Sequence, residues 1–81
     1  MNTATKLLEA MRRHPVDWRI EQPQTVARKM GIAVRCEGGS HHVFSHPAVP
    51  EVVSVPAHRP IKSVYVRQFV ALVDKVKESE Q

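Results

Sequence analysis

The spacing of apolar residues changes twice along this chain, and that change limits its fold more than any other feature. Apolar residues recur at helical spacing before Gly31, alternate with other residues between positions 32 and 55, and return to helical spacing after position 62. A chain of 81 residues forms one domain with one small core. The predicted class is therefore α+β, in the order α-α-β-β-β-α, with a three-stranded antiparallel sheet packed on helices. Such a sheet can bury one face and leave the other in water.

Three segments are predicted to be helical. The first covers residues 4–13, where apolar residues fall at i, i+3, i+4 and i+7 and end before Pro15. The second begins near Pro23, because proline suits the first turn of a helix, and ends at Gly31, because glycine suits the left-handed position that follows one. The third covers about residues 62–77. Its apolar face comprises Tyr65, Phe69, Leu72, Val73 and Val76.

Three strands are predicted, at residues 32–37, 41–45 and 52–55. Gly38-Gly39 lies between the first two and indicates a two-residue hairpin loop. Residues 46–50 contain two prolines and are predicted to form a loop. In the first strand, the side chains predicted to face the core are those of Ile32, Val34 and Cys36.

Charge is unevenly distributed along the chain, whose formal net charge is +4. Between positions 28 and 67 the basic residues are Arg28, Lys29, Arg35, Arg59, Lys62 and Arg67, and the acidic residues are Glu37 and Glu51. A basic segment of this kind suits a polyanion such as RNA, because each neutralised phosphate releases counterions. An ordinary solvated basic surface explains the same charges equally well.

The single cysteine, Cys36, cannot form an internal disulfide, and the chain has no Cys-x-x-Cys pair typical of structural zinc. We expect Cys36 to be a core residue rather than a reactive thiol. No apolar run is long enough to span a membrane, and the N-terminal residues lack the apolar stretch of a signal peptide. The chain is therefore predicted to be cytoplasmic.

Strand parity separates two neighbouring histidines. His42 shares a face with Phe44, the best core candidate of its strand, so His41 is predicted to point away from the helices. His41 also follows Gly39 and Ser40, whose small side chains let a phosphate oxygen approach the backbone. The alternative is that His41 is a surface histidine beside an ordinary turn.

A histidine in this position has a specific chemistry available on RNA. It can remove the proton of a 2′-hydroxyl, which then attacks the neighbouring phosphodiester, because imidazole exchanges protons near neutral pH. Basic side chains would bind the phosphates and steady the transition state. The candidates for this role are Arg35, Arg59, Lys62 and Arg67. The general acid for the leaving 5′-oxygen is left open among His42, His58 and a water molecule.

A metal site is the competing interpretation of the histidines. Zinc needs three or four convergent ligands, whereas His41 and His42 diverge as neighbours on a strand. We therefore expect neither a metal nor another cofactor.

The stretch from Cys36 to Pro47, with its Gly39-Ser40-His41 turn, resembles the HicA family of bacterial mRNA interferase toxins. The segment from Val53 to His58 is similar to that family's third strand and its exit, and the resemblance covers about residues 22–76. It implies a fold like a double-stranded-RNA-binding domain, endoribonuclease activity on mRNA, and inhibition by a HicB-type antitoxin. It places the catalytic role on His41, with His42 as the second choice.

Residues 1–21 would then be a helical extension of a HicA-like core at 22–78, within a single domain of residues 1–81. The residues expected to contact RNA are Gly39, Ser40, Arg35, His58, Arg59, Lys62 and Arg67. A non-catalytic RNA-binding module with the same basic surface is the principal alternative, and a protein-interaction domain is a third.

Overall fold

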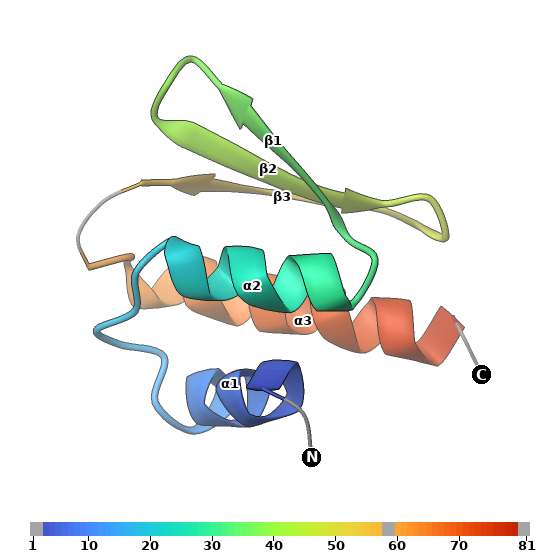
Figure 1. Cartoon of the computed structure of the whole chain (residues 1–81), viewed down its shortest axis with the longest axis horizontal. Coiled ribbons are helices and arrows are strands. Elements are labelled where there is room, and N and C mark those ends of the chain that lie inside the picture. The colour runs from blue at the N-terminus through green and yellow to red at the C-terminus, as the bar shows by residue number, and fades with distance from the viewer. Residues whose placement is uncertain (1–2, 58–59, 80–81) are drawn as a thin grey trace.

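The computed structural model describes residues 3–57 and 60–79. Its elements are α1 (Thr3–Arg13), α2 (Glu21–Lys29), β1 (Ala33–Glu37), β2 (His41–His46), β3 (Val49–Pro56) and α3 (Ser63–Ser79) (Figure 1). Among the described residues, the strands form a 3-stranded antiparallel sheet in the order β1-β2-β3. The predicted α+β class, element order and sheet are therefore confirmed.

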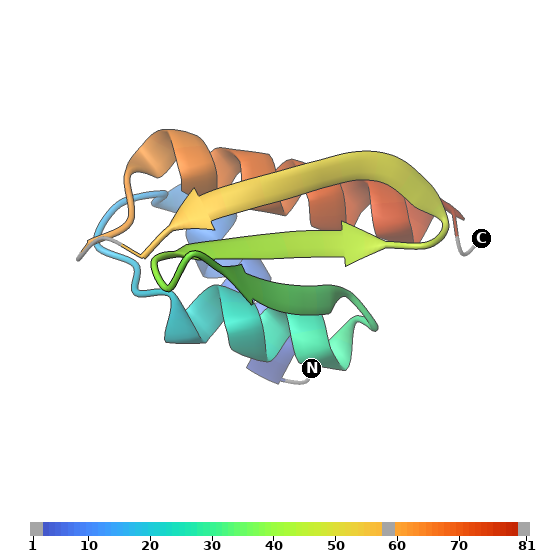
Figure 2. The same ribbon diagram turned by 90° about the horizontal axis from the view of Figure 1, so that it is seen from above.

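The helices cover one face of the sheet and leave the other face open. Helix α2 packs beneath β1 and helix α3 beneath β3, while α1 packs against both helices on the side away from the sheet (Figure 1). The view from above in Figure 2 shows the open face in front of the helices. Side chains that alternate along each strand therefore divide between a buried face and a solvated one.

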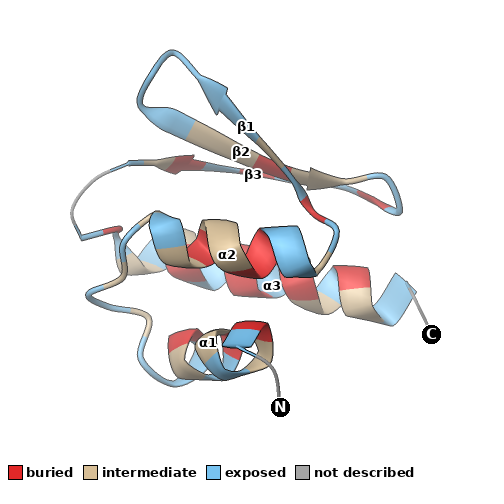
Figure 3. Ribbon diagram, in the orientation of Figure 1, coloured by how far each residue is buried: buried red, intermediate tan, exposed pale blue. Residues whose placement is uncertain are grey.

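The core fills the space between the sheet and the helices, as the buried residues in Figure 3 show. Phe44 of β2 and Phe69 of α3 meet edge to face at its centre, with ring centroids 5.0 Å apart and an interplanar angle of 62°. Helix α2 contributes Val26 and Ala27, both 0% exposed. The buried side of α3 comprises Val66, Phe69, Val70, Leu72, Val73 and Val76.

Helix α1 belongs to the same core. Its residues Ala4, Leu8 and Met11 fall on one helical face and are at most 1% exposed. Arg12 at its last turn forms a bidentate pair with Asp74 of α3, with distances of 2.9 and 2.7 Å from Nη1 and Nη2 to the carboxylate oxygens. This hydrogen bonding lowers the pKa of Asp74. The first helix is thus attached to α3 by both packing and charge.

The connector between α1 and α2 closes one end of the core. Trp18 is half-buried against the core, and its Nε1–H donates a hydrogen bond to the carbonyl oxygen of His14 at 2.6 Å. The carbonyl oxygen of Trp18 accepts a hydrogen bond from the amide of Ile61 at 2.8 Å, so the connector also holds the segment that leads into α3. Asp17 just before it has a φ of 63°, a conformation that aspartate tolerates better than most residues.

The prediction of a two-residue loop at Gly38-Gly39 is wrong. Strand β1 ends at Glu37 and β2 begins at His41, and these two residues are paired, so the loop also includes Ser40. The physical reason is core packing: this register pairs Val34 with Phe44 on the buried face. A two-residue loop would pair Phe44 with Ala33 instead, and so bring an outward-facing position opposite the central core residue.

The predicted loop at residues 46–50 is also wrong, because most of it belongs to strands. Only Pro47 and Ala48 separate β2 from β3, and His46 supports this turn by accepting a hydrogen bond from the amide of Ala48 at Nδ1, 3.0 Å away. Val49 is 7% exposed, so its burial favours the strand. Pro50 is tolerated because β3 lies at the edge of the sheet, where a missing N–H need not interrupt a ladder.

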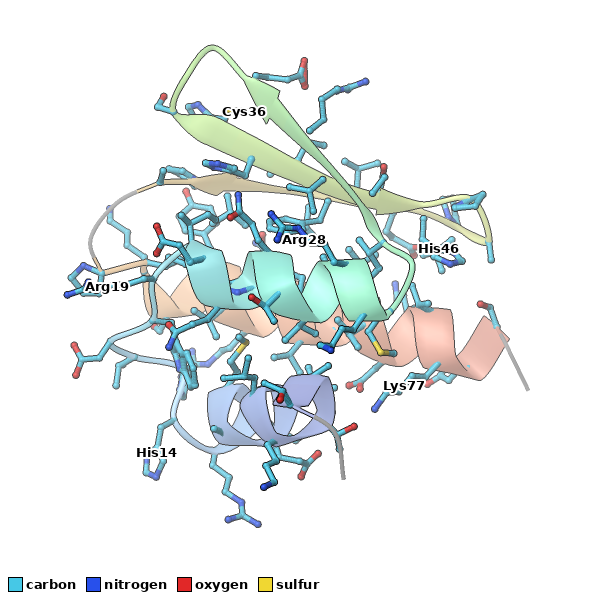
Figure 4. The ribbon with its side chains drawn as sticks, in the orientation of Figure 1. His14, Arg19, Arg28, Cys36, His46 and Lys77 are labelled. Carbon is cyan, nitrogen blue, oxygen red and sulfur yellow. The ribbon has the colours of Figure 1, made fainter. Side chains whose placement is uncertain are left out.

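Cys36 is exposed, so the prediction that it is a core residue is wrong. The turn end of the β1–β2 hairpin rises away from the helices in Figure 1, and Figure 4 places Cys36 near that end. No described helix covers this part of the inner face, so strand parity alone does not bury the side chain.

Candidate active site

His41 begins β2 and lies on the open face of the sheet. Phe44, three residues later, is fully buried, so alternation along the strand directs His41 to the opposite face. The side chain of His41 is accordingly exposed. Its imidazole is accessible to a large ligand from the solvent side.

The turn before His41 is small and open. Gly38 and Gly39 have φ values of 63° and 75°, in the left-handed region that favours glycine. A β-carbon built on either glycine would have no heavy atom within 4 Å apart from those of the adjacent residues, so the backbone here can be approached closely. Ser40 anchors the turn to the end of β3, because its carbonyl oxygen accepts a hydrogen bond from the amide of Ala57 at 2.7 Å.

Ser40 also contacts the catalytic candidate through its side chain. Its Oγ lies 3.3 Å from Nδ1 of His41. This contact at Nδ1 would leave Nε2 as the ring nitrogen that meets a substrate oxygen.

A carboxylate and a guanidinium lie on the strand beside His41. Glu37 is the direct cross-strand partner of His41, and Arg35 lies two residues earlier on the same face of β1. Nη2 of Arg35 lies 3.3 Å from Oε1 of Glu37, and the two side chains are 73% and 55% exposed. The open face thus gathers a guanidinium, a carboxylate and an imidazole within one hairpin.

Sequence reasoning selected Arg35 but missed Glu37. The position of Glu37 could have been found from the core residues of the two strands. Val34 and Phe44 can both face the core as cross-strand partners only when the loop between the strands has an odd number of residues. A three-residue loop then places Glu37 beside His41.

His42 has a different environment from His41. It points to the same side as Phe44, is half-buried, and pairs across the sheet with Cys36 and Val55. Its Nδ1 atom is buried and has no hydrogen-bond partner among the described residues. His41 and His42 therefore lie on opposite faces, and His42 does not adjoin the open face.

The remaining predicted contact residues are dispersed. Lys62 is exposed and directly precedes α3, a helix that begins at the same end of the molecule as the turn between β1 and β2 (Figure 2). Arg67 is exposed on α3 but shares a helical face with Asp74, seven residues later, which pairs with α1. Arg67 therefore faces away from the sheet. His58 and Arg59 lie outside the described residues.

Metal-binding side chains are not clustered. Within residues 3–57 and 60–79, no group of three or more His, Cys, Asp and Glu side chains is placed to hold a metal ion. Figure 4 shows His14, Cys36 and His46 in three separate parts of the molecule.

Two hollows formed by described residues lie away from His41. One is a groove between β3 and α3, lined by Glu51, Val52, Val53, Gln68, Ala71, Leu72 and Lys75. A hydrogen bond from Lys75 lowers the pKa of Glu51 in this groove. The other hollow lies along α1. His41 itself lies on an exposed sheet surface, which suits a polymer better than an enclosed small molecule.

Compared with protein-family profiles, curated proteins and solved structures, the chain matches none. In the described part of the chain, no helix is long and apolar enough to cross a membrane.

Proposed function

We propose that this protein is a metal-independent endoribonuclease in which His41 transfers protons, and that it acts as the toxin of a cytoplasmic toxin–antitoxin pair. The observation that carries the proposal is the placement of His41: an exposed imidazole on an open sheet face, between a turn of small residues and the Arg35–Glu37 pair. The resemblance to HicA supports the same assignment.

RNA is the substrate that suits this surface, because it carries its own nucleophile. Attack of the 2′-oxygen on phosphorus breaks the bond to the 5′-oxygen and yields a 2′,3′-cyclic phosphate and a 5′-hydroxyl. The protein needs only to move two protons and to stabilise negative charge. His41 supplies proton transfer, while Arg35 and the backbone amides of Gly39 and Ser40 are available to the phosphate.

The reaction class is tested with a 5′-labelled single-stranded RNA of mixed sequence in excess EDTA. We expect cleavage products that end in a 2′,3′-cyclic phosphate, and no cleavage of the same oligonucleotide made entirely of DNA. Cleavage of the DNA, or a requirement for added zinc or magnesium, would contradict the proposal. Tight RNA binding without any cleavage would favour the alternative, a non-catalytic RNA-binding module.

A toxin of this type requires an inhibitor, and we propose a HicB-type antitoxin that covers His41 and the open sheet face. Such a partner would block RNA sterically and present carboxylates to Arg35. Co-expression should abolish growth arrest, and the purified complex should not cleave RNA. Hydrogen exchange should show protection at residues 35–46 in the complex; protection confined to α1 would rule out masking of the site.

A further inference from the structure

We propose that Glu37 is the second catalytic residue of this site: its carboxylate accepts the proton of the attacking 2′-hydroxyl, and His41 donates a proton to the leaving 5′-oxygen. This inference rests on the proposed ribonuclease function and states which residue acts as the general base and which as the general acid. It changes the role of His41 from the base expected from the sequence to the acid.

The pairing of β1 with β2 provides the geometry for two-sided catalysis. Glu37 and His41 are direct cross-strand partners on the open face, and the β-carbons of such partners are about 4.5–5.5 Å apart. In an in-line displacement, the attacking and leaving oxygens lie on opposite sides of phosphorus. Two side chains that start from adjacent strands can reach both oxygens of one phosphodiester.

Few side chains around Glu37 and His41 can take part in proton transfer. On the open face, Pro56 is the β3 partner in the row of Glu37 and His41, and Ser54 is the β3 partner in the next row, which contains Arg35; neither Pro56 nor Ser54 titrates. Arg35 is the charged neighbour on β1, with Nη2 at 3.3 Å from Glu37 Oε1. Arg35 cannot act as a base, because a guanidinium does not lose its proton in proteins.

The chemistry of the two groups then fixes their roles. An ionised carboxylate can only accept a proton, whereas imidazole can hold a proton and release it near neutral pH. As the 2′-oxygen bonds to phosphorus, its proton passes to Glu37. The bond from phosphorus to the 5′-oxygen breaks with its electron pair on that oxygen, which takes a proton from Nε2 of His41. Exchange with water then restores both groups, and Arg35 offsets the negative charge on the phosphate.

A purely structural role for Glu37 makes different predictions. Strand β1 lies at the edge of the sheet, and charged side chains on edge strands discourage pairing with other chains. In that role, Glu37 would affect neither the pH dependence of cleavage nor its dependence on the leaving group.

The experiment compares wild type with Glu37→Gln, Glu37→Asp and His41→Ala, using Glu51→Gln as the matched control. Glu51 is also an exposed strand carboxylate paired with a cation, Lys75, but it lies in the groove between β3 and α3. Thermal melts show whether folding is retained, and binding to an oligonucleotide of the same sequence with 2′-deoxyribose throughout, which cannot be cleaved, shows whether affinity is retained. Glu37→Gln should lower kcat by about 100-fold or more, the usual contribution of a general base. Glu37→Asp should restore part of that loss, and Glu51→Gln should cleave like wild type.

Two further measurements separate the roles of base and acid. Wild-type kcat should fall as the pH rises above neutrality, because a general acid must carry its proton. A set of nucleoside 3′-(4-nitrophenyl phosphates) has a leaving group that needs no proton. On these substrates His41→Ala should regain most of its activity relative to wild type, whereas Glu37→Gln should remain impaired.

The outcomes distinguish this inference from the proposed function on which it rests. If wild type cleaves RNA and Glu37→Gln cleaves it equally fast, Glu37 is not catalytic, although the ribonuclease assignment stands. If kcat rises as the pH increases above neutrality, or His41→Ala is not rescued by the nitrophenyl substrates, the assigned roles are wrong. If wild type cleaves no RNA at all, the proposed function fails first.

Discussion

Replacing Leu8 with alanine tests whether α1 is an integral part of the core. Leu8 is 1% exposed, and loss of three buried carbon atoms at about 0.8 kcal/mol each removes roughly 2.4 kcal/mol of transfer free energy. The cavity that remains raises the expected loss to about 2.5–4 kcal/mol. A domain of 81 residues has a total stability of roughly 4–12 kcal/mol. The midpoint of thermal unfolding should therefore fall by on the order of 10–30 °C.

Urea unfolding followed by circular dichroism measures this loss, and Leu7→Ala provides a matched control on the same helix. Leu7 is only partly buried, so the identical substitution should cost clearly less. A loss below about 1 kcal/mol for Leu8→Ala would show that α1 packs only loosely on the domain. An equal loss at both positions would show that the burial of Leu8 is not what sets the cost.

Three further predictions concern the turn, the ion pair and the binding surface. Gly39→Ala should destabilise the fold by about 1–2 kcal/mol in urea unfolding, because the φ of residue 39 is 75°, although a β-carbon there would meet no neighbouring side chain. Gly39→Asn should cost less, because asparagine tolerates a positive φ better than alanine. Equal costs for the two variants would refute backbone strain as the cause. Asp74→Asn should cost less than about 1 kcal/mol at neutral pH, because the Arg12 and Asp74 side chains are 44% and 36% exposed. Since Arg12 lowers the pKa of Asp74 in the folded state, the stabilisation is present above the ordinary aspartate pKa of about 3.9 and is lost as pH falls through the lowered value. Wild type should thus lose more stability than Asp74→Asn between about pH 5 and pH 2, and parallel unfolding curves would contradict this. Finally, Arg35→Gln should reduce the slope of log affinity for single-stranded RNA against log salt concentration by about 0.7, whereas Arg67→Gln should leave the slope unchanged. The reverse result would show that RNA binds at α3 and not at the open face of the sheet.

Most of the architecture could be predicted from the sequence, because the apolar residues that recur at helical or alternating spacing are the residues buried in the core. The α+β class and the element order follow from that spacing, and so does the separation of His41 from Phe44. Local signals were less reliable. Gly38-Gly39 indicated a loop of two residues, but the pairing of Val34 with Phe44 in the core requires three. The two prolines indicated a loop at residues 46–50, but the burial of Val49 favours a strand there.

The candidate site could be predicted only in part, because it depends on strand register. A loop of two residues or three decides whether Glu37 pairs with Ser40 or with His41. The exposure of Cys36 depends on how far the helices extend beneath the hairpin, which no local pattern encodes. Likewise, the basic residues are close in sequence, but helix α3 turns Arg67 toward α1 and away from the open face.

The most direct test of the central claim is the single-turnover rate of RNA cleavage by His41→Ala and His42→Ala, measured beside wild type in EDTA. We predict that His41→Ala is slower by about 100-fold or more with an unchanged thermal midpoint, because the side chain is exposed and transfers a proton. His42→Ala should cleave within a few-fold of wild type, since its ring lies on the other face of the sheet. Wild-type cleavage by His41→Ala together with loss of cleavage in His42→Ala would contradict the account.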